Sequence, residues 1–496
     1  MRLRDRLPNY LKMEDITNLK MCYDFFVTKS GSEYQAYNGK TGVLQFYGTN
    51  FGTVMNDCIG TFTNTGMIQL DHGEFTMTAA GPAINYNGKS VCIRGAGRGL
   101  ASIWVKYGTM ITVPAGYADY VIKNTNKTEV MMNAEVSDLG IYGASSHTAL
   151  GGISFTCSWH GVIRNVGITR FRMNVAADGV DAKGIHFGDD SGAALGAYYN
   201  VVENVYMTDN TIGINFGLLA NACSVNGGSI WGFGDTIIQY GIVEDDSGSV
   251  DLYGVDIAQF KHAGSIGLLL KAETFGGSNY RSFGTRFEEN HTHLSILNNG
   301  GYAKFFGTSF AGTVLHGAIT IANGGGHNIF NGCTIDTLAV VTDGCTSSAK
   351  SKFVNCAGYN SWPFMYTLPI GTASGNPSDS STYYIGSIPN QPWASAATLN
   401  RVYIPRAGQI RAAALNIQNT VNGSAEDVVC VFRLNNTTDY AFATVSMNAA
   451  NVLLANYALD IPVIAGDYIL LKITTPAWVT NPTGCFIGGS ILIECE

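Results

Sequence analysis

The chain has 496 residues, too many for one ordinary core, and this length favours two or three units. It contains 60 Gly, 25 Tyr and 24 Phe but only 13% charged residues, a composition typical of turns and extended apolar runs rather than of helices. The formal net charge of -8 argues against nucleic-acid binding, which needs clustered Lys and Arg. We therefore expect an all-β protein without a nucleic-acid partner.

The N-terminal stretch MRLRDRLPNYLKMEDITNLK is basic but lacks the continuous apolar run of a secretion signal, and no later segment predicts membrane insertion. The 11 Cys are odd in number and show no zinc-ligand spacing, so we expect neither a metal nor a cofactor. A virion protein released by lysis fits these features, as does a cytoplasmic protein.

Residues 38–105 contain a recognisable order of segments. A predicted helix near residues 50–62 is followed by a strand, the turn LDHGEFTM and the segment IRGAGRG. This order resembles the start of the pectate-lyase-like right-handed β-helix superfamily, whose phage tailspike members share it. The resemblance covers roughly residues 30–360. It implies a right-handed parallel β-helix over residues 38–360, preceded by an N-terminal segment, residues 1–37, for attachment to a virion.

Short β-rich units of the form x-Gly/Asn-x-x-Ile/Phe recur along this region. Their last residues are 23 to 39 positions apart, about one coil of a parallel β-helix with inserted loops. The steps between them hold Gly, Asn and Thr instead of the amphipathic helices of a TIM barrel, and most are shorter than a propeller blade. The anchors are Ile141, Ile168, Met207, Ile230, Ile257, Phe287, Phe310 and Ile335.

Side chains of a strand alternate between its two faces, so each unit has a predicted direction. Val205 with Met207 and Val255 with Ile257 are predicted to point inward, as are the matching pairs of other units. Their neighbours then form an outward stripe in which aromatic faces suit the C–H faces of a sugar ring and charged groups suit its hydroxyls. The stripe consists of Tyr206, Thr208, Ser229, Trp231, Asp256, Arg286, Glu288, Ser309, Thr334 and Asp336.

Tyr206, Trp231 and Arg286 are the predicted carbohydrate-binding residues of the stripe, and Asp256 and Glu288 are its candidate catalytic residues. On adjacent strands with an offset of two residues, the Cα atoms of the two acids would lie roughly 8 Å apart. Inverting glycosidases separate their carboxyl groups by roughly 6.5 to 9.5 Å. The alternative is that Arg286 forms exposed ion pairs with both acids and no reaction takes place.

Two acidic clusters lie in predicted loops. Asp189 and Asp190 belong to the longest step and are predicted to reach over the stripe and contact the glycan. Residues 244–246 could do the same. Solvated loop carboxylates are the alternative for both clusters, and the ligand spacing of a calcium loop is missing.

Residues 361–393 concentrate Pro, Gly and Ser and are interpreted as a linker. From residue 400, alternating segments such as VVCVFRLNN and YAFATVSM predict an antiparallel β-sandwich, most simply a jelly roll. The C-terminal domain is therefore assigned to residues 361–496, with its core at 400–496. It resembles the C-terminal jelly-roll modules of tail fibres, which trimerise or bind sugar, and both roles stay open.

These features lead to three hypotheses. In the first, the chain is a viral tail spike or fibre protein of the virion, a homotrimer that recognises, and in one version depolymerises, a host-surface polysaccharide. Its N-terminus would attach to a baseplate or tail protein. The second is a cell-encoded extracellular polysaccharide lyase or glycoside hydrolase of the β-helix fold. The third is a structural fibre without sugar binding, which would leave Tyr206 and Trp231 unexplained.

Overall fold

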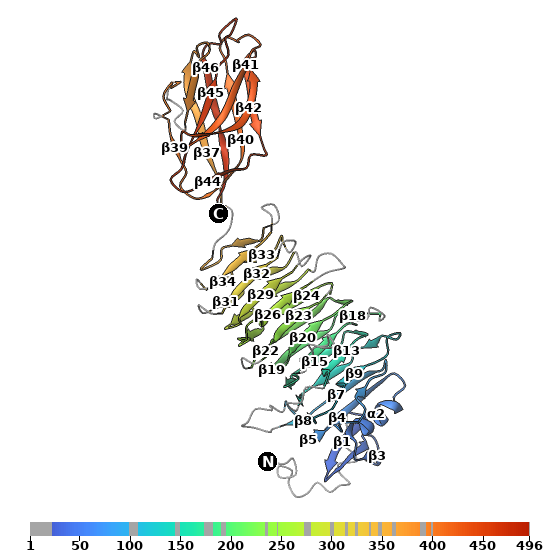
Figure 1. Cartoon of the computed structure of the whole chain (residues 1–496). Coiled ribbons are helices and arrows are strands. Elements are labelled where there is room, and N and C mark those ends of the chain that lie inside the picture. The colour runs from blue at the N-terminus through green and yellow to red at the C-terminus, as the bar shows by residue number, and fades with distance from the viewer. Residues whose placement is uncertain are drawn as a thin grey trace, which may run out of the picture. The chain divides into compact units, whose positions relative to one another are not determined.

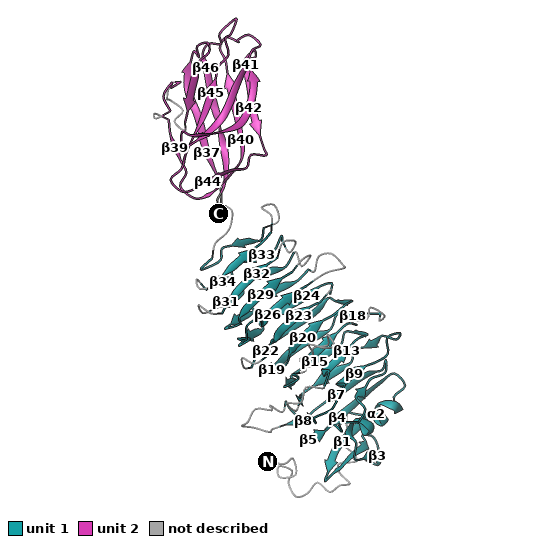
Figure 2. Cartoon of the chain, viewed as in Figure 1, with its two compact units in different colours: residues 1–360 teal, residues 361–496 magenta. Residues whose placement is uncertain are grey.

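The computed structural model divides the chain into two compact units, residues 1–360 and residues 361–496 (Figure 2). Both units are built from strands, and the helix found among the described residues is α2 (Phe51–Thr61). That helix is too short to cross a membrane. The structure describes residues 22–98, 108–143, 149–172, 182–189, 195–233, 237–245, 247–271, 279–297, 302–312, 316–322, 326–336, 339–345, 350–359, 364–386, 393–397 and 400–495.

Unit 1 is a parallel β-solenoid whose coils stack to form three walls (Figure 1). Wall 1 comprises β4 (Thr65–Leu70), β7 (Ser90–Arg94), β11 (Glu135–Ser137), β15 (Val162–Arg164), β19 (Val201–Thr208), β22 (Cys223–Trp231), β24 (Val250–Tyr253), β27 (Arg281–Phe283), β30 (Lys304–Phe306), β33 (Ile329–Asn331) and β36 (Lys352–Val354). Wall 2 comprises β5 (Gly73–Thr76), β8 (Thr109–Val113), β12 (Leu139–Gly143), β16 (Gly167–Thr169), the second halves of β19 and β22, β25 (Asp256–Ala258), β28 (Arg286–Glu288), β31 (Ser309–Ala311) and β34 (Thr334–Ile335).

Wall 3 comprises β6 (Ile84–Asn85), β9 (Tyr120–Asn124), β13 (Gly151–Phe155), β17 (Lys183–Phe187), β20 (Ile212–Phe216), β23 (Tyr240–Glu244), β26 (Ile266–Leu270), β29 (Thr292–Ile296), β32 (Ala318–Ile321) and β35 (Val341–Asp343). A short ladder follows wall 3 along the chain: β10 (Met131–Met132), β14 (Ser158–Trp159), β18 (Ala197–Tyr198) and β21 (Ala220–Asn221). The predicted parallel β-helix is thus confirmed.

A residue with positive φ lies at the corner between wall 1 and wall 2 in each of eight described coils, and it is the Gly, Asn or Asp that begins the repeat unit; in one coil Gly228 follows with positive φ as well. Glycine and, less readily, Asn or Asp adopt this left-handed conformation. The side-chain amides of two successive corners also form a hydrogen bond: Asn204 Nδ2 donates to Asn165 Oδ1 at 2.7 Å. The corner residues are Asp138, Asn165, Asn204, Gly227, Gly254, Gly284, Gly307 and Gly332, with φ of 49° to 64°.

The eight anchors of the repeat lie in one column of wall 2, each paired in register with the next, from Ile141 to Ile335. All are buried in the core of the solenoid. Aromatic anchors stack face to face, with the rings of Phe287 and Phe310 5.0 Å apart. Because identical positions of successive coils lie about 4.8 Å apart, a repeat in sequence becomes a continuous apolar column.

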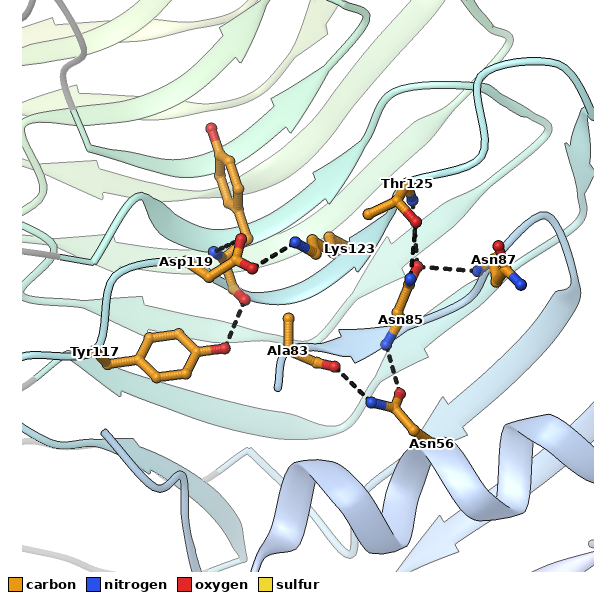
Figure 3. Close-up of polar contacts among 9 residues, drawn as sticks. Asn56, Ala83, Asn85, Asn87, Tyr117, Asp119, Lys123 and Thr125 are labelled. Carbon is orange, nitrogen blue, oxygen red and sulfur yellow. Dashed lines mark hydrogen bonds and ion pairs between the residues drawn. The ribbon is translucent and has the colours of Figure 1, made fainter. Parts of the chain in front are cut away.

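Helix α2 packs against β2 (Glu33–Asn38), β3 (Leu44–Gly48) and β6 beside the first coils. Asn50 caps its N-terminus by accepting from the Thr53 amide. Asn56 attaches the helix to the solenoid, since its Nδ2 donates to the Ala83 carbonyl and its Oδ1 accepts from the Asn85 amide, both at 2.8 Å (Figure 3). Its buried face has helical spacing: Phe51, Gly52, Val54, Met55, Cys58 and Ile59.

Unit 2 is an antiparallel β-sandwich with its own core. Sheet I has the order β37 (Phe364–Gly375), β46 (Cys485–Cys495), β40 (Gly408–Gln418) and β43 (Asn451–Asn456), with β44 (Ile461–Val463) on β40. Sheet II has the order β38 (Thr382–Ile385), β45 (Tyr468–Thr474), β41 (Asp427–Leu434) and β42 (Thr438–Ser446), with β39 (Val402–Tyr403) on β45. When the short strands β39 and β44 are left out, eight strands remain. The first, β37, lies beside the last, β46, and the second, β38, lies beside the seventh, β45, which is the order of a jelly roll.

Strands also lie in the two segments that the sequence analysis assigned to no β domain, residues 1–37 and 361–393. Strand β1 (Phe25–Ser30) pairs in parallel with β4 and antiparallel with β2, so the sheet begins inside the segment 1–37. Strand β37 begins at Phe364, inside the segment interpreted as a linker, and pairs with the last strand of the chain. Periodicity could not reveal either strand, because β1 precedes the repeat and β37 contains Pro and Gly.

Candidate carbohydrate-binding surface

The predicted stripe lies on the outer face of wall 2 as two columns. In the first column, Tyr206, Ser229, Asp256 and Arg286 are paired in register on β19, β22, β25 and β28. In the second column, Thr208, Trp231, Ala258 and Glu288 are paired in the same way. The inward neighbours are buried, so the alternation read from the sequence describes this wall correctly.

Trp231 is the central aromatic side chain of the stripe and is 40% exposed. Its indole nitrogen donates to Asp256 Oδ2 at 2.9 Å, and its ring centroid lies 6.2 Å from that of Tyr206. The bond fixes the indole across the two columns and leaves part of the ring in solvent. An aromatic surface beside a carboxylate can cover the C–H face of a pyranose while the acid accepts from a hydroxyl.

Asp256 has one oxygen in contact with Trp231 and one in a different environment. Asp256 Oδ1 is buried, and no hydrogen-bond donor reaches it from the described part of the chain. A buried carboxylate oxygen without a donor is costly, because it loses its water without compensation.

Glu288 and Arg286 form an exposed ion pair at the other end of the stripe, with Arg286 Nη2 2.7 Å from Glu288 Oε1. The alternative was that Arg286 forms ion pairs with both Asp256 and Glu288. In the structure Arg286 pairs with Glu288, whereas Asp256 accepts a hydrogen bond from Trp231. Asp256 pairs in register with Arg286, so Glu288 is offset from Asp256 by two residues on the adjacent strand. Diagonal neighbours of this kind are about 7 to 8 Å apart between Cα atoms.

Arg98 lies beside the stripe, although the sequence offered no reason to place it there. Its guanidinium lies over the Tyr206 ring, 5.9 Å from the ring centroid, and its Nη1 donates to the Asn204 carbonyl at 3.3 Å. The segment GAGRG that contains Arg98 is separated from Tyr206 by more than 100 residues. No periodic signal in the sequence connects the two positions.

A second polar cluster borders the stripe at the N-terminal side of Trp231. Asp209, whose amide donates to the Trp231 carbonyl, is buried and contacts Arg172 and Arg170. Burial raises the pKa of Asp209, while the bond from Arg172 opposes this shift. The guanidinium of Arg170 also lies over the ring of Tyr142 at 5.3 Å. Two cations share one carboxylate here, so this border is positively charged.

Two carboxylates of the acidic loop clusters, Asp189 and Glu244, are buried at wall 3. Asp189 is buried and pairs with Lys127 Nζ at 2.9 Å, just after β17 of wall 3, so it is not an exposed carboxylate reaching over wall 2. Asp190 lies outside the described residues. Glu244 is buried in wall 3, where its Oε1 accepts from the Ser247 amide and hydroxyl. Over the described ranges no group of three His, Cys, Asp or Glu side chains is arranged for a metal ion.

Comparisons with known proteins give a likeness at the level of solved structures. No protein-family model and no curated protein matches the chain. A tailspike protein gp49 of Acinetobacter baumannii bacteriophage Fri1, described as a capsular polysaccharide depolymerase, matches over 90% of this chain and 82% of its own, with 12% identity and a TM-score of 0.34. Full-length tailspike protein 2 of Escherichia coli O157:H7 bacteriophage CAB120 matches over 89% and 70%, with 10% identity and a TM-score of 0.36. The tailspike protein gp49 of Pseudomonas phage LKA1 matches over 87% and 88%, with 11% identity and a TM-score of 0.26.

Proposed function

We propose that this chain is a tail spike protein of a virion, and that the stripe on wall 2 binds a polysaccharide of the host surface. The observation that carries the proposal is the partly exposed Trp231 ring, which a hydrogen bond to Asp256 holds on the outer face of the wall beside Tyr206. A sugar would cover the exposed part of this ring, and its hydroxyl groups would bond to the polar side chains around it.

The shape of wall 2 supports an extended ligand. Each coil repeats the outer positions at a spacing of about 4.8 Å, so successive coils present side chains in a straight line. From Tyr206 to Glu288 the stripe crosses four coils and alternates aromatic, acidic and basic groups. A linear glycan of several residues matches such a surface better than a compact small molecule does.

We further propose that Asp256 and Glu288 cleave a glycosidic bond of the bound polysaccharide. One carboxyl would protonate the leaving oxygen and the other would activate a water on the opposite face of the sugar. The offset of two residues between adjacent strands supports this pairing, because it puts both side chains on the same face of the wall with Cα atoms about 7 to 8 Å apart.

The test uses purified full chain and surface polysaccharide of the host, with release of reducing ends as the readout. Asp256→Asn and Glu288→Gln keep side-chain size but remove a carboxylate, so each should lower turnover at least a hundredfold while the chain still binds. Asp251→Asn is the matched control, since Asp251 forms a bidentate ion pair with Arg281 on wall 1, away from the stripe. Turnover by both stripe variants at the wild-type rate would refute the catalytic assignment.

Binding without cleavage is the second candidate function, and specific contacts favour it. Glu288 is engaged by Arg286 at 2.7 Å and Asp256 by Trp231 at 2.9 Å, so both acids already serve as fixed acceptors on the surface. A receptor-binding surface needs only such fixed groups. Product-free binding of intact polysaccharide by the wild-type chain would establish this candidate over the hydrolase.

We also propose that three chains assemble in parallel and attach to the baseplate or tail through the N-terminal segment, most of which lies outside the described residues. Three parallel stripes on one repetitive glycan surface gain avidity without any new contact. Light scattering should give three times the 52.9 kDa chain mass, and a monomer at micromolar concentration would refute the assembly.

A further inference from the structure

Sheet II of unit 2 carries a group of aromatic and basic side chains on its outer face. Tyr384 pairs in register with Lys472, and Tyr403 pairs with Tyr468, which lies four residues from Lys472 on the same strand. Their strand neighbours Ile385, Val402, Ile469 and Ile473 are buried in the core of the sandwich, so these four side chains point away from it.

The charged groups of this face are held by one another. Arg433 donates to Asp439 through Nε at 2.6 Å and Nη2 at 2.8 Å, and Lys472 donates to the same carboxylate at 2.7 Å. Arg433 also lies over the ring of Tyr384. Leu470 points to this face by alternation and is nevertheless fully buried. The charged side chains of this face are held by one another and therefore have little freedom to lose on binding.

Arg401 and Tyr403 form the open part of the face. Tyr403 is 59% exposed, and the guanidinium of Arg401 lies 4.4 Å from the centroid of the Tyr468 ring. Arg401 is exposed to solvent. Within the described ranges no carboxylate pairs with Arg401, so the planar donor groups of its guanidinium remain available for an anion.

The balance of charge indicates the class of ligand. Arg433 and Lys472 share one carboxylate, Asp439, and Arg401 adds a third cation, so this part of the face carries more positive than negative groups within a chain of net charge -8. The middle of the outer face of sheet I, by contrast, presents the small or uncharged residues Ala414, Asn416, Gly488 and Ser490. Exposed tyrosine rings with basic groups suit a sugar that carries a negative charge.

We propose that the outer face of sheet II is a second glycan-binding site, specific for acidic saccharides that carry a carboxylate or phosphate group. Tyr403 covers the sugar ring and Arg401 binds the anionic group, while Arg433, Lys472 and Asp439 form the fixed platform beside them. This second site rests on the proposed function because it would bind the same host glycan as the stripe. Its residues all belong to unit 2, so it can be tested separately from the stripe.

The experiment compares four full-length proteins: wild type, Trp231→Ala, the double variant Tyr403→Ala with Arg401→Gln, and the combination of all three changes. The probe is a printed array of bacterial capsular and lipopolysaccharide glycans with neutral, uronate-containing and phosphate-containing repeats. Trp231→Ala should retain binding to acidic glycans, and the combination should lose it by at least tenfold, or about 1.4 kcal/mol. Added salt should weaken this retained binding, because the site is exposed and charged.

Two control variants separate binding from folding. Tyr403→Phe keeps the ring and should retain most of the affinity. Tyr457→Ala removes a tyrosine that is more exposed than Tyr403, at 75%, and that follows β43 of sheet I, so it should leave binding unchanged. The double variant and the two controls should melt within a few degrees of wild type, since their substituted side chains are exposed.

Each other result decides against one proposal. Equal binding by Trp231→Ala and by the combination, or retained binding to neutral glycans alone, would overturn the second site. A changed molecular mass of the double variant would show that the face binds a second copy of the chain. If the double variant Tyr403→Ala with Arg401→Gln binds no better than the combination of all three changes, Trp231 contributes no binding. That result refutes glycan binding by the stripe and supports the second site. A wild-type chain that binds no glycan on the array refutes both sites. The uronate and phosphate subsets identify the anionic group.

Discussion

Replacement of Trp231 by Ala tests whether the stripe binds sugar or only covers the wall. A fully buried aromatic side chain costs about 3 to 5 kcal/mol when it is truncated to Ala. Trp231 leaves 40% of its surface in water, so we expect the free energy of unfolding to fall by about 2 to 3 kcal/mol. The affinity for glycan should fall at least tenfold, or about 1.4 kcal/mol, because a stacking surface is lost.

The assay is titration calorimetry with host polysaccharide at 25 °C, with thermal unfolding of the same samples measured in parallel. Trp231→Phe is the companion variant: it retains an aromatic ring but removes the indole donor to Asp256, so it should bind better than the Ala variant. Phe287→Ala is the structural control, since this ring is fully buried in the neighbouring inward column and should cost stability with little direct effect on binding. Unchanged affinity of a folded Trp231→Ala protein would refute the placement of the ligand on the stripe.

Three further predictions concern stability. Removal of residues 361–496 should leave unit 1 folded, because each coil contacts mainly its neighbours and unit 1 has its own core, and circular dichroism with a cooperative melt would show this. Burial lowers the pKa of His293 to about 4, below its ordinary value of 6.5. Between these pH values the unfolded chain binds more protons than the folded chain, so the stability should fall as the pH drops from about 6.5 to 4. Thermal melts of His293→Gln should show a smaller dependence on pH in this range. The hydrogen bonds from Arg433, together with Lys472, lower the pKa of Asp439 to about 2. The stabilisation by this carboxylate is therefore complete above about pH 4 and is lost as the pH falls towards 2. Acid titrations of the Asp439→Asn variant should lack this loss of stability.

The sequence was sufficient to predict the solenoid because its repeat corresponds to one physical unit. Each Gly, Asn or Asp of the repeat occupies the left-handed corner between walls 1 and 2, a conformation that few other residues adopt without strain. The residue three positions later, such as Ile257, points into the core and stacks on the same position of the next coil. Alternation along the strand then placed Trp231 and Glu288 on the outer face.

Loop and terminal positions could not be read in this way, since they have no period. Asp189 pairs with Lys127, 62 residues away, and Arg98 lies over Tyr206, which is more than 100 residues away. Strand β37 contains Pro and Gly that look like a linker, and only its pairing with β46 reveals a strand.

The sequence by itself determined the architecture, the inward columns and the residues of the stripe, because neighbouring coils repeat the same positions at a constant spacing. Only the tertiary structure decided which side chains on the stripe contact one another: Trp231 bonds to Asp256, while Arg286 pairs with Glu288. Only the structure brought Tyr403, Tyr468 and Arg433 onto one face of sheet II, since β39, β45 and β41 are adjacent in the sheet but distant along the chain. Contacts between such distant segments follow from how the sheet is assembled, and no local pattern in the chain encodes them.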